Sequence, residues 1–133
     1  MAEDFRPRFD AKHRVLAIAF GARLTEDIYM EGYALMSRFI AAQGPCSLIL
    51  DLTAVTQFEL SNEFLRLIGS KLAVPGALKR LAVAPQPVIF GSGRMVETLR
   101  SEGDAPIQVV RTLAEAYAAL GATAADFTAV DKI

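Results

Sequence analysis

Residues 46–68 read CSLILDLTAVTQFELSNEFLRLI and contain one complete strand–loop–helix unit. The run 47–52 is almost wholly apolar and has the length of a buried strand. A polar loop follows it, and Ser61 is then a favourable N-cap for an amphipathic helix. The apolar stripe of that helix is Phe64 or Leu65, followed by Ile68 and Leu72. Because similar units precede and follow it along the chain, this segment decides the predicted fold.

Two strands and one helix are predicted before this unit. Residues 5–9 (FRPRF) alternate apolar with basic residues, which is the period of a half-buried strand. Pro7 cannot donate a backbone hydrogen bond, so this strand is expected at an edge of the sheet. The turn that joins it to a second strand at 14–20 is so short that the two strands must be antiparallel. A helix then begins after the N-cap Thr25 and ends at Gly44.

The chain after the unit repeats the alternation of strand and helix. Pro75 and Gly76 end the helix that Ser61 begins, and Gly121 ends the last helix. Residues 122–133 are predicted to be a C-terminal tail that Phe127 and Val130 anchor. The elements predicted in between are a strand at 81–84, a helix within 86–102, a strand at 107–110 and a helix that Thr112 caps.

The element order is therefore ββαβαβαβα, an α/β fold in which an N-terminal antiparallel hairpin precedes parallel βα units. Each strand–helix–strand step is expected to be a right-handed crossover. The leucines of 48–52 lie on one face of their strand, and Leu81 and Val83 are bulkier than the alanines beside them. This pattern predicts a mixed five-stranded sheet with the helices mostly on one face. Residues 1–121 are expected to form a single domain.

The composition argues against several classes of partner and location. The net charge of −1 at pH 7 and a pI near 5.8 provide no positive field for nucleic acid or an anionic membrane. A single cysteine cannot form an intramolecular disulfide, which fits a reducing compartment. The N-terminus MAEDFRPRFD lacks the apolar stretch of a signal peptide, and no apolar run reaches the roughly eighteen residues of a membrane span. The expectation is a cytoplasmic protein that does not insert into membranes.

This topology, together with LILDLTAVTQFELSNEFL at 48–65, resembles the STAS superfamily, in particular the SpoIIAA-like anti-sigma-factor antagonists. Those chains carry a buried strand that ends in Asp-Leu-Ser or Asp-Leu-Thr, a short loop, and Asp-Ser-Ser-Gly at the next helix. The segments IQVVRTLAEAYAALG at 107–121 and FGSGRMVETL at 90–99 also look like a bacterial group called SpoIIAA-like or STAS/SEC14-like. The resemblance covers roughly residues 5–121 and implies the SpoIIAA-like fold.

The resemblance also implies a site at the start of the helix that Ser61 begins. Ser61 lies where the family's phosphorylatable serine lies, and a protein partner would dock on Glu59, Leu60, Ser61, Asn62 and Glu63. Three of the four signature positions differ, because Glu59 replaces Asp, Leu60 replaces Ser and Asn62 replaces Gly. The side chain of Asn62 would crowd a partner that approaches the serine. A plain N-cap role for Ser61 is the interpretation we favour over phosphorylation.

Two functions from different classes follow from this reading. The first is a non-enzymatic protein-interaction and regulatory domain. It is expected to form a homodimer, because the hairpin carries more apolar residues than helices on one side can bury: Phe5, Phe9, Leu16, Ile18 and Phe20. The alternative, implied by the SEC14-like resemblance, is a module that binds a small molecule or lipid near Phe90, Arg94 and Met95.

No set of residues predicts catalysis. The run Gly91-Ser92-Gly93-Arg94 lacks the spacing of a Walker loop or a dinucleotide loop, so its glycines are interpreted as sites of close helix packing. Asp51 is expected to organise its loop and Glu59 to be solvated, rather than to form an acid–base pair. The single histidine, His13, lies in a predicted turn, and Cys46 is expected to be a small buried hydrophobic residue. We therefore predict no cofactor, no metal site and no enzymatic activity.

Overall fold

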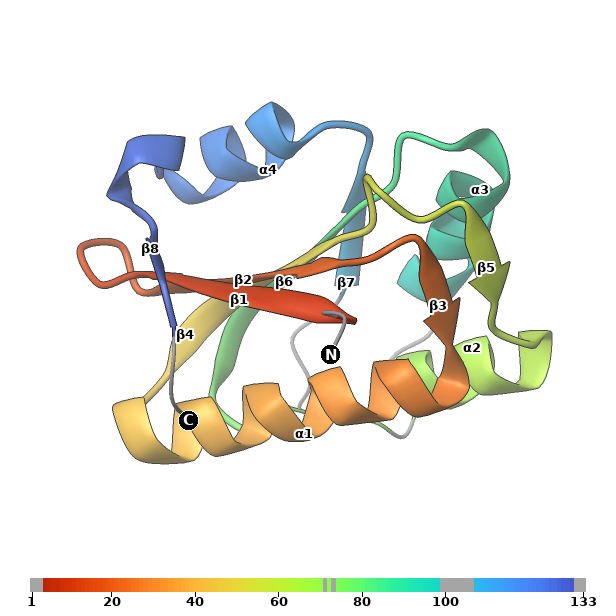
Figure 1. Cartoon of the computed structure of the whole chain (residues 1–133), viewed down its shortest axis with the longest axis horizontal. Coiled ribbons are helices and arrows are strands. Elements are labelled where there is room, and N and C mark those ends of the chain that lie inside the picture. The colour runs from red at the N-terminus through yellow and green to blue at the C-terminus, as the bar shows by residue number, and fades with distance from the viewer. Residues whose placement is uncertain (1–3, 71, 73, 99–106, 131–133) are drawn as a thin grey trace.

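A mixed six-stranded sheet runs through the centre of the fold, in the strand order β7-β6-β4-β2-β1-β8 (Figure 1). The structure is a computed structural model that describes residues 4–70, 72, 74–98 and 107–130. Strands β2, β4, β6 and β7 are parallel, while β1 pairs antiparallel with both β2 and β8. The strands are β1 Phe5–Asp10, β2 Val15–Phe20, β4 Cys46–Asp51, β6 Ala77–Val83, β7 Ile107–Val110 and β8 Thr128–Ala129.

Three helices cover one face of the sheet and one covers the other, which matches the predicted distribution. Figure 1 shows α1 and α2 below the sheet and α4 above it. The main core joins the sheet to α1, α2 and α3, whereas a smaller core of Ile49, Leu81 and Val83 packs on Ala116 and Tyr117 of α4. The helices are α1 Glu26–Gln43, α2 Asn62–Ser70, α3 Pro87–Glu97 and α4 Leu113–Leu120.

The large and small side chains of β4 and β6, from which this arrangement was predicted, are distributed over the two faces differently from the prediction. Leu50 is paired with Ala82 and Ile49 with Leu81 in the register of β4 and β6. The large side chains of β6, Leu81 and Val83, therefore face α4 with Ile49, while its alanines face the main core beside Leu50. The main-core face thus combines large with small side chains on these two strands. The alanines on β6 leave space under α3, which matters for the pocket described below.

The C-terminal segment adds a sixth strand to the five that were predicted. Strand β8 pairs with β1 at only two positions, Arg8 with Ala129 and Phe9 with Thr128, after a short 3₁₀ helix η1 (Ala124–Asp126). Strand β1 is therefore not an edge strand. The amide of Val130 donates to the carbonyl of Pro7 at 3.1 Å, so the backbone of Pro7 turns its hydrogen-bonding side toward β8. The amide hydrogen that proline lacks would point the same way, and its absence therefore costs no hydrogen bond between β1 and β2. Two-residue pairing leaves almost no periodicity for sequence reasoning to detect.

The anchoring of this segment was predicted correctly. The ring of Phe127 packs on Tyr117 in the α4-side core, with ring centroids 5.2 Å apart, and Val130 packs against the main core.

The apolar residues of the hairpin are buried inside the molecule instead of forming an exposed face. Leu16, Ile18 and Phe20 are fully buried in the main core, and Phe5 and Phe9 are partly buried against it. Phe9 makes an edge-on contact with Phe39 of α1, with ring centroids 4.8 Å apart. The reason for expecting a homodimer was therefore wrong, because α1 covers this surface.

Two short strands that the sequence did not suggest connect the beginnings of two helices. Strands β3 (Arg23–Thr25) and β5 (Gln57–Glu59) form a separate parallel pair. Helix α1 begins directly after β3, and α2 begins shortly after β5. Thr25 caps α1 as predicted, because the amide of Ile28 donates to its hydroxyl. The N-termini of α1 and α2 are consequently held side by side.

Candidate functional site

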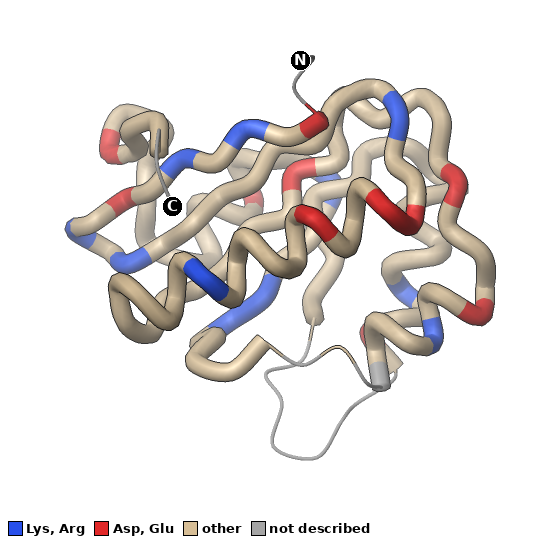
Figure 2. The backbone as a smooth tube through the Cα atoms, turned by 60° about the horizontal axis from the view of Figure 1, so that its bottom comes forward, with Lys and Arg blue, Asp and Glu red and all other residues tan. Residues whose placement is uncertain are grey.

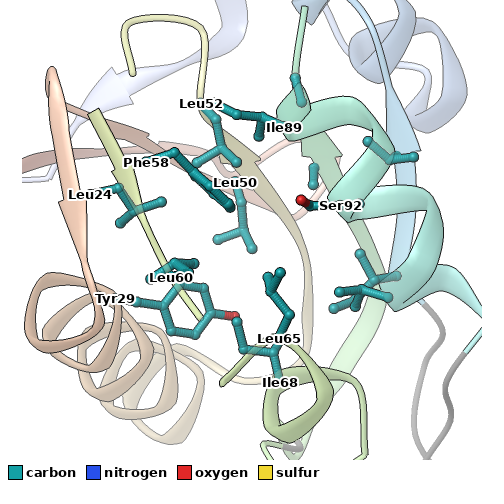
Figure 3. A pocket seen from close by; sticks show the side chains of 16 residues that line it. Leu24, Tyr29, Leu50, Leu52, Phe58, Leu60, Leu65, Ile68, Ile89 and Ser92 are labelled. Atoms are coloured by element: carbon teal, nitrogen blue, oxygen red, sulfur yellow. The ribbon is translucent and has the colours of Figure 1, made fainter. Parts of the chain in front are cut away.

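The predicted docking segment 59–63 and an apolar pocket lie next to each other at one end of the sheet. Strands β4 and β6 end here, and the carboxyl ends of parallel strands are where ligand sites gather in open α/β sheets. The pocket is enclosed by the sheet, by β3 and β5, and by helices α2 and α3 (Figure 3). The docking segment and the pocket share Leu60 and therefore form one candidate site.

Ser61 caps α2, as the sequence predicted. The amide of Phe64, three residues on, donates to its hydroxyl oxygen at 3.0 Å. Helix α1 contributes a second partner, because both the amide and the hydroxyl of Ser61 donate to the same carboxylate oxygen of Glu26, at 3.2 and 3.0 Å. The serine thus joins the starts of two helices. A phosphate on this hydroxyl would stand against the Glu26 carboxylate and repel it.

An ion pair reinforces this junction. Arg23 of β3 donates to both carboxylate oxygens of Glu59 on β5, at 3.1 and 3.2 Å. This hydrogen bonding holds the pKa of Glu59 below its usual value and raises that of Arg23. Both side chains are exposed, so solvent screens the pair and its contribution to stability is small. Glu59 is accordingly an exposed, ion-paired surface group.

The five residues of the predicted docking segment divide into two groups. Glu59, Ser61, Asn62 and Glu63 are exposed, whereas Leu60 is half-buried and lines the pocket. Figure 2 shows acidic positions at the starts of α1 and α2, and the acidic side chains there are Glu26, Asp27, Glu59 and Glu63. We call this group the acidic rim.

The pocket is almost wholly apolar, open on one side and about 60 Å³ in volume. An engineered apolar cavity of about 150 Å³ holds one benzene molecule, so this space is less than half of that size. Among the described residues of its lining, the side-chain polar atoms are the hydroxyls of Tyr29 and Ser92, which Figure 3 shows. The aliphatic and aromatic lining comprises Leu24, Leu50, Leu52, Phe58, Leu60, Leu65, Ile68, Ile89, Val96, Ile107 and Val109.

Small residues on the sheet and on α3 account for the empty space. Ala82 and Ala84 of β6 and Ser92 and Gly93 of α3 all line the pocket. Gly93 also sets the distance between helix and sheet, because a Cβ there would lie 2.8 Å from a methyl group of Val109. This contact confirms the predicted close packing for Gly93. Gly91 has no such contact, since nothing lies within 4 Å of its Cβ position.

The three residues predicted for ligand binding lie outside this pocket. Arg94 is 65% exposed and pairs with Glu97 at 3.4 Å, and Met95 is half-buried against the core. Phe90 borders a second, open hollow of about 360 Å³ on the other side of α3, where the guanidinium of Arg111 lies 4.0 Å from its ring centroid. The face of α3 that lines the apolar pocket carries Ile89, Ser92, Gly93 and Val96 instead.

Three other residues with reactive side chains, Asp51, Cys46 and His13, lie outside the apolar pocket. Asp51 is buried and accepts a hydrogen bond from the amide of Thr53 at 3.0 Å, which is the loop-organising role that was predicted. Cys46 is fully buried, as expected, and burial raises the pKa of its thiol. His13 lies in the β1–β2 turn beside Asp10, at the other end of the sheet from the pocket.

Comparison of the chain with protein-family models, with curated proteins and with solved structures finds no match in any of the three. The geometry of the sites is therefore the basis for a functional proposal. Among the described residues, no helix is long and apolar enough to cross a membrane.

Proposed function

We propose that this chain is a non-enzymatic module that binds a small apolar ligand between its sheet and helices α2 and α3. The observation that supports this function is the open apolar pocket of about 60 Å³ at the carboxyl ends of β4 and β6. Interiors of proteins are normally close-packed, and an empty apolar cavity reduces stability. An apolar ligand that fills this space would recover the lost contacts.

The lining defines the chemistry of the ligand. No charged side chain among the described residues lines the pocket, so the part that enters is expected to be uncharged. The volume is less than half of the roughly 150 Å³ of a cavity that holds one benzene ring, so only a narrow part of a molecule fits. The hydroxyl of Ser92 can form one hydrogen bond with such a group. The ligand class is therefore a short aliphatic chain, or the apolar end of a longer molecule whose polar part remains at the acidic rim.

Filling the pocket tests this proposal directly. The side chain of Ser92 points into the pocket (Figure 3), so Ser92→Leu places an isobutyl group where the ligand would bind. We expect 1-hexanol to cause saturable amide chemical-shift changes around the pocket in the wild type and none in Ser92→Leu. Filling a cavity typically raises the free energy of unfolding by about 0.5–2 kcal/mol, so the variant should remain folded.

Ser92→Ala is the matched control, because it removes the hydroxyl while leaving the space open. It should bind 1-hexanol with an affinity reduced by no more than one hydrogen bond, about 0.5–1.5 kcal/mol. Equal hexanol-induced shifts in the wild type and in folded Ser92→Leu would place the ligand elsewhere and contradict the proposal.

A second candidate, a protein-docking module, is favoured by the exposed residues around Ser61. Glu59, Asn62 and Glu63 are accessible next to a serine that is itself exposed, and the acidic rim would complement a basic segment of a partner. The hydroxyl of Ser61 is engaged by Glu26 and by the amide of Phe64. Phosphorylation would have to break the first of these contacts, and it would thereby separate the starts of α1 and α2.

Substitutions of Ser61 test this candidate. Ser61→Ala should lower the free energy of unfolding by about 1 kcal/mol, the usual value of an N-cap. Ser61→Asp retains a capping oxygen but brings a second carboxylate to Glu26, so it should also lower the free energy of unfolding. The double variant Ser61→Asp/Glu26→Gln removes this repulsion and should recover the free energy that Ser61→Asp loses. Chemical denaturation provides the energies. If the docking function holds, Ser61→Asp should change the set of partners recovered from the native host, whereas identical sets for wild type, Ser61→Ala and Ser61→Asp would exclude the switch.

A further inference from the structure

Three potential metal ligands from distant parts of the sequence meet at the opposite end of the sheet from the pocket. Asp10 ends β1, His13 lies in the β1–β2 turn, and Asp126 belongs to η1 near the C-terminus. Figure 1 shows the β1–β2 turn and the segment before β8 together on one side of the molecule, away from α2 and α3. One ligand atom of each side chain lies within 4.8 Å of those of the other two.

The imidazole of His13 occupies the middle of this group. Its Nδ1 lies 2.7 Å from Oδ2 of Asp10 and 3.7 Å from Oδ2 of Asp126. Ligands of a tetrahedral zinc ion, about 2.0–2.2 Å from the metal, are roughly 3.4 Å from each other. The two observed separations bracket this value, so small side-chain rotations would bring the three atoms to a common centre.

The charge of the group supports a cationic ligand. The Asp10 side chain is 0% exposed, although a carboxylate is costly to bury without compensation. The amides of Lys12 and His13 donate to Oδ1 of Asp10, at 2.9 and 3.1 Å, while Oδ2 faces the imidazole of His13. Within the described part of the chain, His13 is the only basic side chain at ion-pair distance from either Asp10 or Asp126. Two carboxylates therefore face a single imidazole, a combination of oxygen and nitrogen donors that suits a cation.

We propose that Asp10, His13 and Asp126 form a zinc site, with Nδ1 of His13 and one oxygen from each carboxylate as protein ligands. An imidazole nitrogen favours Zn²⁺ over Mg²⁺ or Ca²⁺, which prefer oxygen ligands alone. Three protein ligands leave a fourth position for water. On binding, the hydrogen bond between His13 and Asp10 is replaced by two metal bonds, and the proton of the neutral imidazole resides on Nε2.

Such an ion would fasten the C-terminal segment to the hairpin. Without it, the contacts of the segment with β1 include the two residue pairs of β8, the amide of Val130, the hydroxyl of Thr128 and the ring of Phe127 under Arg8. A metal held by Asp10 and His13 on the hairpin and by Asp126 on η1 adds a cross-link between positions more than a hundred residues apart in sequence. This inference goes beyond the proposed ligand-binding function and does not depend on it.

Calorimetric titration of the untagged, EDTA-treated protein with ZnCl₂ tests the site. We expect one equivalent of Zn²⁺ to bind and hydrogen exchange of residues 127–130 to slow on binding. His13→Gln and Asp126→Asn should each weaken zinc binding by about 100-fold or more, since loss of even an indirect support of a ligand typically costs 10–100-fold. Glu31→Gln, which removes an exposed carboxylate from α1, is the matched charge control and should bind like the wild type.

Circular dichroism of the metal-free variants establishes that they fold, and Asp126→Asn changes no side-chain shape. Zinc affinity unchanged in both ligand variants, or no binding of zinc by the wild type, would overturn the proposal. Preferential binding of Ca²⁺ would overturn the role of the imidazole nitrogen.

Discussion

Leu50→Ala is expected to lower the free energy of unfolding by about 2–5 kcal/mol, the range for large-to-small substitutions in cores. Leu50 is 7% exposed and lies on β4, between Ile18 of β2 and Ala82 of β6. Its side chain also lines the pocket, so truncation adds to an existing space. The surrounding side chains already fail to fill that space, and they cannot relax far enough to close a larger one. We therefore expect a cost in the upper part of the range.

Urea denaturation of wild type and variant measures this loss. Leu78→Ala is the matched control: it makes the same change on neighbouring β6, where Leu78 is 57% exposed, and should cost less than about 1 kcal/mol. Benzene should raise the melting temperature of Leu50→Ala more than that of the wild type, because an enlarged apolar cavity can hold the ring. A loss for Leu50→Ala no greater than for Leu78→Ala would show that this part of the core is not packed as described.

The sequence was informative wherever a local physical rule acts alone. Hydroxyl residues placed before apolar stripes identified the helix starts at Thr25, Ser61 and Thr112. Each of these hydroxyl oxygens accepts a hydrogen bond from the backbone amide three residues later. The apolar run at 47–52 became β4, whose residues are all buried. These features depend on neighbours within four positions, which a single sequence contains.

Features that depend on distant segments could not be predicted in the same way. Strands β3 and β5 are three residues long and mostly polar, so no alternation distinguishes them from loops. Their pairing is nevertheless what brings Arg23 to Glu59 and Glu26 to Ser61. The predicted docking segment was placed on the surface by local reasoning, but its partners on α1 and β3 lie more than thirty residues earlier in the chain.

The pocket was missed for a different reason. Its lining consists of leucines, isoleucines and valines that have the same spacing as core residues, so periodicity cannot separate a filled space from an empty one. The usable signal was the row of small residues, Ala82 and Ala84 on the strand and Ser92 and Gly93 on the helix. Whether such residues face one another depends on the register of β6 under α3, which only the structure supplies.

Ionisation of Tyr29 is expected to lower the free energy of unfolding at alkaline pH, in addition to the effect of the other titratable groups. Tyr29 lies on α1 with its ring parallel to Phe20 and edge-on to Phe64, at centroid distances of 6.4 and 5.7 Å. Figure 3 shows its hydroxyl end beside Leu65 and Ile68, and the charge of Arg80 opposes part of the effect of burial on its pKa. Burial raises the pKa of Tyr29 to about 12, from an ordinary value of 10.0. The folded state therefore keeps this proton over a range in which the unfolded chain releases it.

This difference fixes the sign of the pH dependence. Below about pH 10 both states hold the proton and stability is unaffected, whereas between about pH 10 and pH 12 the unfolded state binds fewer protons and the free energy of unfolding falls as pH rises. A shift of about two pKa units corresponds to about 3 kcal/mol in total, of which roughly half is lost by pH 11. Tyr29→Phe preserves the ring contacts but has no proton to release. Urea denaturation from pH 8 to 11 should therefore show the wild type losing about 1–1.5 kcal/mol more than Tyr29→Phe, and parallel curves for the two proteins would mean that the hydroxyl of Tyr29 ionises as readily in the folded state as in the unfolded chain.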